Sequence, residues 1–127
     1  MTDVISTPDA PAAVGAYSQA TTTGDLVFTA GQIALTPDGE FLGDEPVDVQ
    51  ARQVLENLSA VLEAAGSSLA DALKVTIFLA DIDDYGAVNE VYETFFDEAP
   101  PARSAVAVAD LPKGAAVEIE AVAAVAD

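Results

Sequence analysis

Basic side chains are scarce in this 127-residue sequence: 22 acidic residues face only four basic ones. The four are Arg52, Lys74, Arg103 and Lys113. Arginine suits an anionic metabolite best, because its planar fork donates two parallel hydrogen bonds to a carboxylate. Arg103 follows two prolines at the mouth of an expected strand, on a stiffened loop of the kind that often carries functional groups. Either Arg103 binds an anionic ligand, or it pairs with acidic groups on the surface.

The other three cations have less specific settings. Arg52 is expected on the surface of a helix, four residues before Glu56, where the two side chains can pair. Lys113 belongs to an expected solvated turn with Gly114. Lys74 points away from its neighbour Val75 and could serve either as a ligand or as a surface residue.

Two carboxylates near the end of the chain share one side of an expected strand. Glu118 and Glu120 are two residues apart, so their side chains point to the same face, which Val122 and Ala124 continue as an apolar surface. A carboxylate on a buried apolar face needs a partner or a chemical role. The alternative is a strand end that faces solvent.

The composition removes several chemistries. The sequence has neither cysteine nor histidine, which excludes disulfides, thiol nucleophiles, Ser-His-Asp triads and metal sites built on these residues. The segment 81–86 begins like a calcium-binding loop, but Tyr85 and Tyr92 occupy positions where oxygen ligands are required. Glycine-rich phosphate-binding motifs are missing as well. We therefore expect no metal and no cofactor, and chemistry carried by carboxylates, arginine, lysine, tyrosine, hydroxyls, backbone and water.

The formal net charge of −18 restricts the partners. Such a polyanion repels phosphate backbones, so no nucleic acid partner is expected. Net charges of about 2–8 are usual for a small domain. The excess is typical of halophilic proteins, because the Debye length falls to about 3 Å in molar salt; the alternative is an ordinary, very soluble acidic protein. No secretory signal and no apolar run near the ~20 residues needed to cross a membrane are recognised, so a cytoplasmic location without membrane contact is expected.

Apolar periodicity predicts the elements that must position these residues. Strands are expected over 16–21, 26–30, 73–79, 105–109 and 117–125, with a hairpin turn at 36–39 that returns through Phe41 and Leu42. Apolar residues at three- and four-residue steps predict a helix over 47–65, which Gly66 ends. A second helix, capped by Asp83, is expected to reach Phe95.

This order predicts one α+β domain over residues 1–127, with a single mixed sheet and both helices on one face. Most strands are apolar on both sides, and 51% of the residues are hydrophobic. No third helix is available to cover the second face of the sheet. Another subunit is therefore expected to cover it, which makes the protein a homo-oligomer.

Five segments in order along the chain carry a resemblance to a known family: 10–20 (APAAVGAYSQA), 28–33 (FTAGQI), 50–58 (QARQVLENL), 101–104 (PARS) and 111–121 (LPKGAAVEIEA). They resemble the RidA (YjgF-type) reactive-intermediate deaminases. The resemblance implies a chorismate-mutase-like fold and a homotrimer with three sites in the clefts between subunits. It also implies cofactor-free hydrolysis of imines and enamines, such as 2-aminoacrylate and 2-iminobutanoate, to 2-keto acids and ammonia.

The same resemblance assigns roles to individual residues. Arg103 would bind the substrate carboxylate and Glu118 would position water, with Glu120 in a supporting role. Three further residues would line the cleft: Tyr17, Gly31 and Asn89. Two positions depart from the family pattern. Ala16 replaces the usual proline, and Ala105 stands where many relatives carry cysteine, so that its backbone would contact the substrate and no thiol is available.

Two other functions remain to be weighed. The same fold could form a trimer that binds a keto acid or another small metabolite without turnover, since a fold does not fix a function. RNA cleavage is sometimes ascribed to relatives, but the strongly negative charge argues against it.

Overall fold

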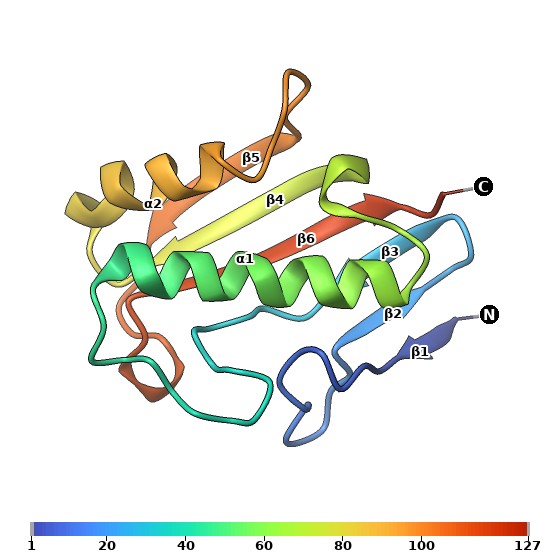
Figure 1. The fold of residues 1–127 in the computed structure, drawn as a ribbon, viewed down its shortest axis with the longest axis horizontal. Coiled ribbons are helices and arrows are strands. Elements are labelled where there is room, and N and C mark those ends of the chain that lie inside the picture. The colour runs from blue at the N-terminus through green and yellow to red at the C-terminus, as the bar shows by residue number, and fades with distance from the viewer. Residues whose placement is uncertain (1, 127) are drawn as a thin grey trace.

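The computed structural model describes residues 2–126 and contains one six-stranded sheet with two α-helices across one face (Figure 1). The strands are β1 (Asp3–Ile5), β2 (Ala20–Thr22), β3 (Leu26–Thr29), β4 (Ala72–Leu79), β5 (Ala102–Ala107) and β6 (Val117–Ala124). The helices are α1 (Val47–Ala64) and α2 (Tyr85–Glu93). The sheet order is β1-β2-β3-β6-β4-β5, in which β4 and β5 run parallel and the other neighbours antiparallel. The predicted fold class is confirmed.

The core lies between the sheet and α1. This helix buries one apolar stripe completely, including Leu55, Leu58 and Leu62, and removal of such surface from water is the main stabilising contribution. Along β6 buried and half-buried residues alternate strictly: Val117 and Ile119 face the helices, and the residues between them face the other way. Helix packing on one side of β6 thus fixes which side chains point to the uncovered side.

Strand β5 begins earlier than its sequence pattern indicates. The predicted strand was 105–109, whereas β5 spans Ala102–Ala107, because its parallel register with β4 already pairs Lys74 with Ala102. Arg103 therefore lies inside a strand and not on the preceding loop. Strand β5 is also an edge of the sheet, open to the approach of another chain.

Other boundaries differ in the irregular N-terminal third. The predicted strand 16–21 is reduced to β2, and β1, which was not predicted, pairs with it. The turn at 36–39 is present, with the Gly39 amide donating to the Thr36 carbonyl at 2.8 Å, but the return through Phe41 forms only an isolated bridge to Leu35.

Helix α2 begins at Tyr85, after a 3₁₀ turn that Asp81, not Asp83, caps by accepting from the Asp83 amide at 2.9 Å.

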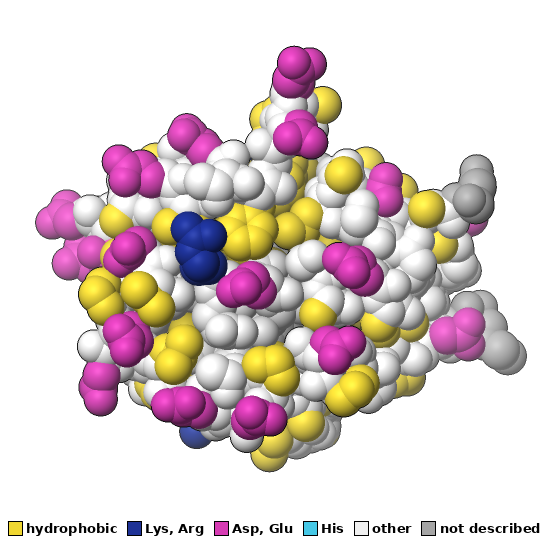
Figure 2. All heavy atoms as spheres, in the orientation of Figure 1, with side chains coloured by type: hydrophobic (Ala, Val, Ile, Leu, Met, Phe, Trp, Pro, Cys, Tyr) yellow, Lys and Arg dark blue, Asp and Glu magenta, His cyan; other side chains and the backbone are white. Residues whose placement is uncertain are grey.

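The sheet face opposite the helices has no helix across it in the described part of the chain, and it carries apolar side chains beside the polar Lys74, Glu118 and Glu120. Phe28 pairs with Val122 across β3 and β6, and Phe78 pairs with Val106 across β4 and β5. Phe28 is 46% exposed and Val106 is 44% exposed. The helix-bearing face, by contrast, carries many separate acidic side chains (Figure 2). Within residues 2–126, no helix combines the length and the apolar character that a membrane crossing requires.

A buried amide attaches the loop after β3 to α1. Asn57 is only 1% exposed, and its Nδ2 donates to the carbonyl oxygens of Leu35 at 2.8 Å and Ile33 at 3.4 Å, while its Oδ1 accepts from Gln53. These bonds hold the segment that follows Gly31 against the helix.

Replacement of this amide should be costly. Asn57→Ala is expected to lower the free energy of unfolding by about 2 kcal/mol, because buried carbonyl groups lose their donor. Urea denaturation measures the change, with Ser59→Ala as the matched control on the same helix, since the Ser59 hydroxyl bonds only to Glu63 at the surface. Equal losses in the two variants would contradict the anchoring role of Asn57.

Candidate active site

Glu118 and Gly31 are in such close contact that any side chain at position 31 would displace the Glu118 carboxylate from the place it occupies. A Cβ atom built on Gly31 would lie 2.3 Å from Oε2 of Glu118 and 2.7 Å from its Cδ. The two residues are brought together by the backbone of their neighbours, since Gln32 and Ile119 exchange hydrogen bonds of 2.9 and 3.1 Å. The missing side chain of Gly31 leaves the space that the Glu118 carboxylate occupies.

The surroundings of Glu118 disfavour its charge. Burial raises the pKa of the Glu118 carboxyl above its ordinary value, and the neighbouring charge of Glu120 raises it further. A carboxyl group with a raised pKa exchanges protons more readily near neutral pH than an ordinary one. Glu118 therefore holds its proton more tightly than an ordinary carboxyl group.

A cavity of about 560 Å³ opens in front of this carboxylate. Tyr17, Gly31, Lys113 and Glu118 all line it. Lys113 has a left-handed backbone with φ of +58°, an uncommon conformation for a residue other than glycine, and it follows Pro112 in a short 3₁₀ turn. Three residues predicted from the sequence, Tyr17, Gly31 and Glu118, are thus gathered in one hollow.

The wall that carries Tyr17 is held by one buried side chain. Gln19 is 3% exposed, and its Nε2 lies 2.8–3.3 Å from the carbonyl oxygens of Thr7, Ala10 and Pro11. Its Oε1 accepts from the Thr7 amide at 2.7 Å. An irregular segment with few backbone partners of its own is thereby tied to the start of β2.

Arg103 lies in a second hollow, between α2 and β5, which Asn89, Tyr92, Phe96 and Pro100 also line. Its Nη1 donates to Oδ1 of Asn89 at 2.7 Å, and its Nη2 donates to the hydroxyl of Tyr85. The guanidinium carbon lies 4.6 Å from the ring centroid of Tyr92 and 5.4 Å from that of Tyr85. These three residues, Asn89, Tyr85 and Tyr92, make a neutral, aromatic setting for a full positive charge.

The neutral setting bears on the two alternatives for Arg103. Glu93 also lines the hollow, but its Oε1 accepts from Nδ2 of Asn89 at 3.1 Å, so a neutral amide stands between the carboxylate and Arg103. The hydrogen bonds that Arg103 makes go to uncharged groups. Its charge thus remains available to an anionic ligand.

The two hollows lie on opposite faces of the sheet. Arg103 and Ala105 point toward the helices, opposite the buried side chains of Val75 and Ile77, whereas Glu118 points to the uncovered face, opposite Phe78. A single chain therefore brings together Asn89 with Arg103, and separately Tyr17 and Gly31 with Glu118, but does not join the two sets.

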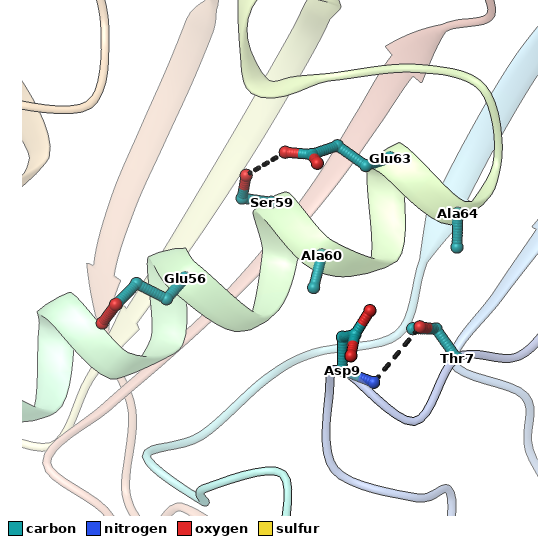
Figure 3. A pocket seen from close by; sticks show the side chains of 7 residues that line it. All are labelled: Thr7, Asp9, Glu56, Ser59, Ala60, Glu63 and Ala64. Atoms are coloured by element: carbon teal, nitrogen blue, oxygen red, sulfur yellow. Dashed lines mark hydrogen bonds between the residues drawn. The ribbon is translucent and has the colours of Figure 1, made fainter.

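A third hollow, of about 520 Å³, lies between the N-terminal segment and α1 (Figure 3). Its polar lining includes Asp9, Glu56 and Glu63, with no basic residue. Ser59 donates to Glu63 at 3.0 Å, and the amide of Asp9 donates to Thr7 at 3.2 Å, as the dashed lines show. Three carboxylates would repel an anionic metabolite, so this hollow is not the candidate site.

Sequence reasoning missed three residues of these hollows. From the sequence, Tyr85 and Tyr92 are departures from a calcium-loop pattern, Tyr92 also lies on the predicted second helix, and Lys113 is a solvated turn residue. The helical spacing of Tyr85, Asn89 and Tyr92, at steps of four and three residues, was the signal that could have placed both tyrosines beside Asn89. The remaining cations make other contacts: Arg52 lies over the ring of Phe95, and Lys74 donates to Ser104 at 2.7 Å.

Residues 7–125 match the family described as Endoribonuclease L-PSP. The chain is 48% identical over 120 residues to the 2-iminobutanoate/2-iminopropanoate deaminase of Rattus norvegicus, covering 94% of this chain and 88% of the rat protein. Among solved structures it is similar to RidA of an Antarctic Psychrobacter, with a TM-score of 0.92, 45% identity and coverage of 97% and 99% of the two chains. E. coli TdcF with bound serine gives a TM-score of 0.92 at 45% identity, with coverage of 98% and 99%.

The raised pKa of Glu118 predicts a pH-dependent effect of its removal. A carboxyl whose pKa is higher in the folded state binds its proton more tightly there, so its contribution to stability falls as pH rises from the ordinary value of 4.5 through the folded value. Glu118→Gln should therefore increase the free energy of unfolding at neutral pH, and this gain should shrink as the pH falls toward 4.5.

Urea denaturation of the parent and of Glu118→Gln over this pH range tests the expectation. Glu120→Gln serves as the companion variant, because loss of its charge should lower the pKa of Glu118 in a carboxyl NMR titration. A stability difference that stays constant with pH would contradict the assigned environment of Glu118.

Proposed function

The chain belongs to the Endoribonuclease L-PSP family, which includes the RidA-type proteins, and we propose that it hydrolyses 2-imino acids and their enamine tautomers to 2-keto acids and ammonia. The observation that carries this proposal is the pair of preformed half-sites: an arginine among neutral partners and a partly buried glutamate beside a glycine. The name of the rat relative supports the same reaction class.

Arg103 would hold the carboxylate that every 2-imino acid carries. A guanidinium offers two parallel N–H groups to a carboxylate, and its charge is met by no carboxylate within the chain in the hydrogen bonds described above. E. coli TdcF has been crystallised with serine, itself a 2-amino acid with a free carboxylate, which supports a ligand of this class. The backbone around Ala105, the next residue on the same face of β5, would contact the ligand too.

Glu118 would act on the water molecule. Hydrolysis adds water to the carbon of the C=N bond and then breaks the C–N bond of the resulting carbinolamine, which releases ammonia and leaves the keto group. The carboxylate of Glu118 would take a proton from the attacking water and return it to the departing nitrogen. Its raised pKa favours the first transfer, because a carboxylate with a higher pKa is the stronger base.

The two half-sites would meet in a cleft between subunits of a homotrimer. Arg103 and Glu118 cannot meet within one chain, as they face opposite sides of the sheet. The exposed Phe28 and Val106 on the uncovered face and the open edge at β5 both favour association of identical chains. Tyr17 and Asn89 would then line the cleft from the two subunits that form it.

The family description also names RNA cleavage, which the electrostatics disfavour. A formal net charge of −18 repels a phosphate backbone, and the chain has only four basic residues to counter this repulsion. A keto-acid-binding trimer without turnover is the other alternative. The raised pKa of Glu118 favours catalysis, because a binding module has no need of a proton-transfer group.

Substitution of the two central residues should affect different kinetic constants. Arg103→Lys keeps the charge but loses the fork, so KM should rise and kcat/KM should fall by about 2–4 kcal/mol in transition-state free energy. Glu118→Gln keeps the shape but removes the base, so kcat should fall by roughly 10²–10⁴-fold while a keto acid still binds. Steady-state imine hydrolysis and calorimetric binding of 2-oxobutanoate measure the two effects.

The matched control is Glu63→Gln on α1, which removes a surface carboxylate on the helix face and should leave both constants unchanged. Normal turnover by Glu118→Gln, or unaltered keto-acid binding by Arg103→Lys, would refute the assigned roles. Binding of 2-oxobutanoate by the parent without any release of ammonia from imines would favour the non-catalytic alternative.

Assembly gives an independent test. Light scattering in high salt should report about three times the chain mass of 12.9 kDa. Phe28→Asp on the uncovered face should yield the single-chain mass, because a buried charge without a partner opposes association. Val49→Asp, which introduces the same charge on α1 at a site that is 38% exposed, should remain trimeric. A stable, active monomer of the parent would exclude the shared cleft.

A further inference from the structure

We propose that Tyr85 is a positioning residue for Arg103: its hydroxyl and its ring fix the orientation in which the guanidinium meets the substrate carboxylate. The inference rests on the proposed function, in which Arg103 binds that carboxylate. It is carried by the hydrogen bond from Nη2 of Arg103 to the Tyr85 hydroxyl and by the position of the guanidinium over the Tyr85 ring.

The local fold places Tyr85 where it can do this. It is the first residue of α2, directly after the 3₁₀ turn that Asp81 caps, and its half-buried ring packs against the hydrophobic core. Asn89 follows four residues later, so that both side chains lie on the same side of the helix. The start of α2 thus presents two hydrogen-bond acceptors in line above β5.

The two acceptors bind different nitrogen atoms of the guanidinium. Asn89 takes a hydrogen from Nη1 and Tyr85 takes one from Nη2, so rotation of the planar group about its own axis would break both bonds together. A guanidinium has five N–H groups in a rigid fork, and two of these contacts leave about three for a ligand. The ring of Tyr92, with its centroid 4.6 Å from the guanidinium carbon, restricts motion out of the plane.

A fixed fork improves binding of a carboxylate in particular. A flexible arginine side chain loses conformational freedom when it forms a bidentate pair, whereas one that is already ordered loses less. The Tyr85 hydroxyl contributes to this ordering without competing charge, because it is neutral. Its removal should therefore weaken the binding of carboxylates and leave the binding of uncharged analogues unchanged.

The variant Tyr85→Phe keeps the ring and removes only the hydroxyl. We expect its affinity for 2-oxobutanoate to fall about fivefold to tenfold, the size of one ordinary hydrogen bond, because the ligand keeps its own bonds to the guanidinium. KM should rise by a similar factor, kcat should change less than about twofold, and affinity for the neutral 2-oxobutanamide should not change. Thr94→Val is the matched control, because it removes a hydroxyl at the end of α2 that bonds only to the Val91 carbonyl.

A second measurement reads the positioning directly and needs no ligand. The chain has two arginines, Arg52 and Arg103, so side-chain NMR resolves two guanidinium groups. In Tyr85→Phe the rotation of the Arg103 guanidinium should become faster, and that of Arg52, which lies over Phe95, should not change. Unaltered rotation of Arg103 would overturn the inference.

The ligand results separate this inference from the proposed function. Faster rotation with unchanged keto-acid affinity, or equal weakening for the acid and the amide, would show that Tyr85 does not act through the orientation of Arg103. If the parent neither binds 2-oxobutanoate nor hydrolyses imines, the proposed function fails and the role of Tyr85 in it fails too. If the parent does both and Tyr85→Phe matches it, only the present inference fails.

Discussion

Both helices of this chain cover the same face of the six-stranded sheet, and the other features of the molecule depend on that arrangement. The antiparallel register of β6 against β4 places Ile119 opposite Ile77 in the core and therefore sends Glu118 to the uncovered side. A shift of one residue would exchange these positions, because side chains alternate between the faces of a strand. The same core that stabilises the fold thus decides which carboxylate is available for chemistry.

The neighbours of Arg103 and Glu118 control the charge at each of the two half-sites. In a chain of net charge −18, a lone arginine would ordinarily be neutralised by nearby carboxylates. Here Asn89 bonds to Arg103 through its oxygen and to Glu93 through its nitrogen, which keeps the acid one side chain away. On the other face, Glu120 and burial disfavour the charge of Glu118. Around Arg103 and around Glu118 the local electrostatics therefore differ from those of the acidic surface: the arginine has neutral partners, and the charge of the glutamate is disfavoured.

Periodicity in the sequence was sufficient for the elements with long, regular patterns. Helix α1, strands β4 and β6 and the shared face of Glu118 and Glu120 agree with expectation because packing on one side enforces a strict pattern. The N-terminal third was harder, since β1 and β2 are three residues long and depend on pairing with each other.

The sequence predicts the residues of the site better than their arrangement, because the arrangement depends on pairing between distant segments. A motif resemblance predicts Arg103, Glu118, Tyr17, Gly31, Asn89 and Ala105 as site residues, but no local pattern reveals that Arg103 and Glu118 face opposite ways. That division follows from the parallel pairing of β5 with β4, a contact between segments about 30 residues apart. Likewise, the contact of Tyr85 with Arg103 spans 18 positions and becomes visible only when α2 packs over β5.

The side chain of Gln19 joins several residues of the N-terminal segment to one another. Because one amide side chain supplies the contacts to Thr7, Ala10 and Pro11, these contacts form and break together. Gln19 thereby couples the positions of three residues in the stretch that leads to Tyr17. Loss of this one amide would therefore disturb a whole wall of the neighbouring cavity at once, and not a single contact.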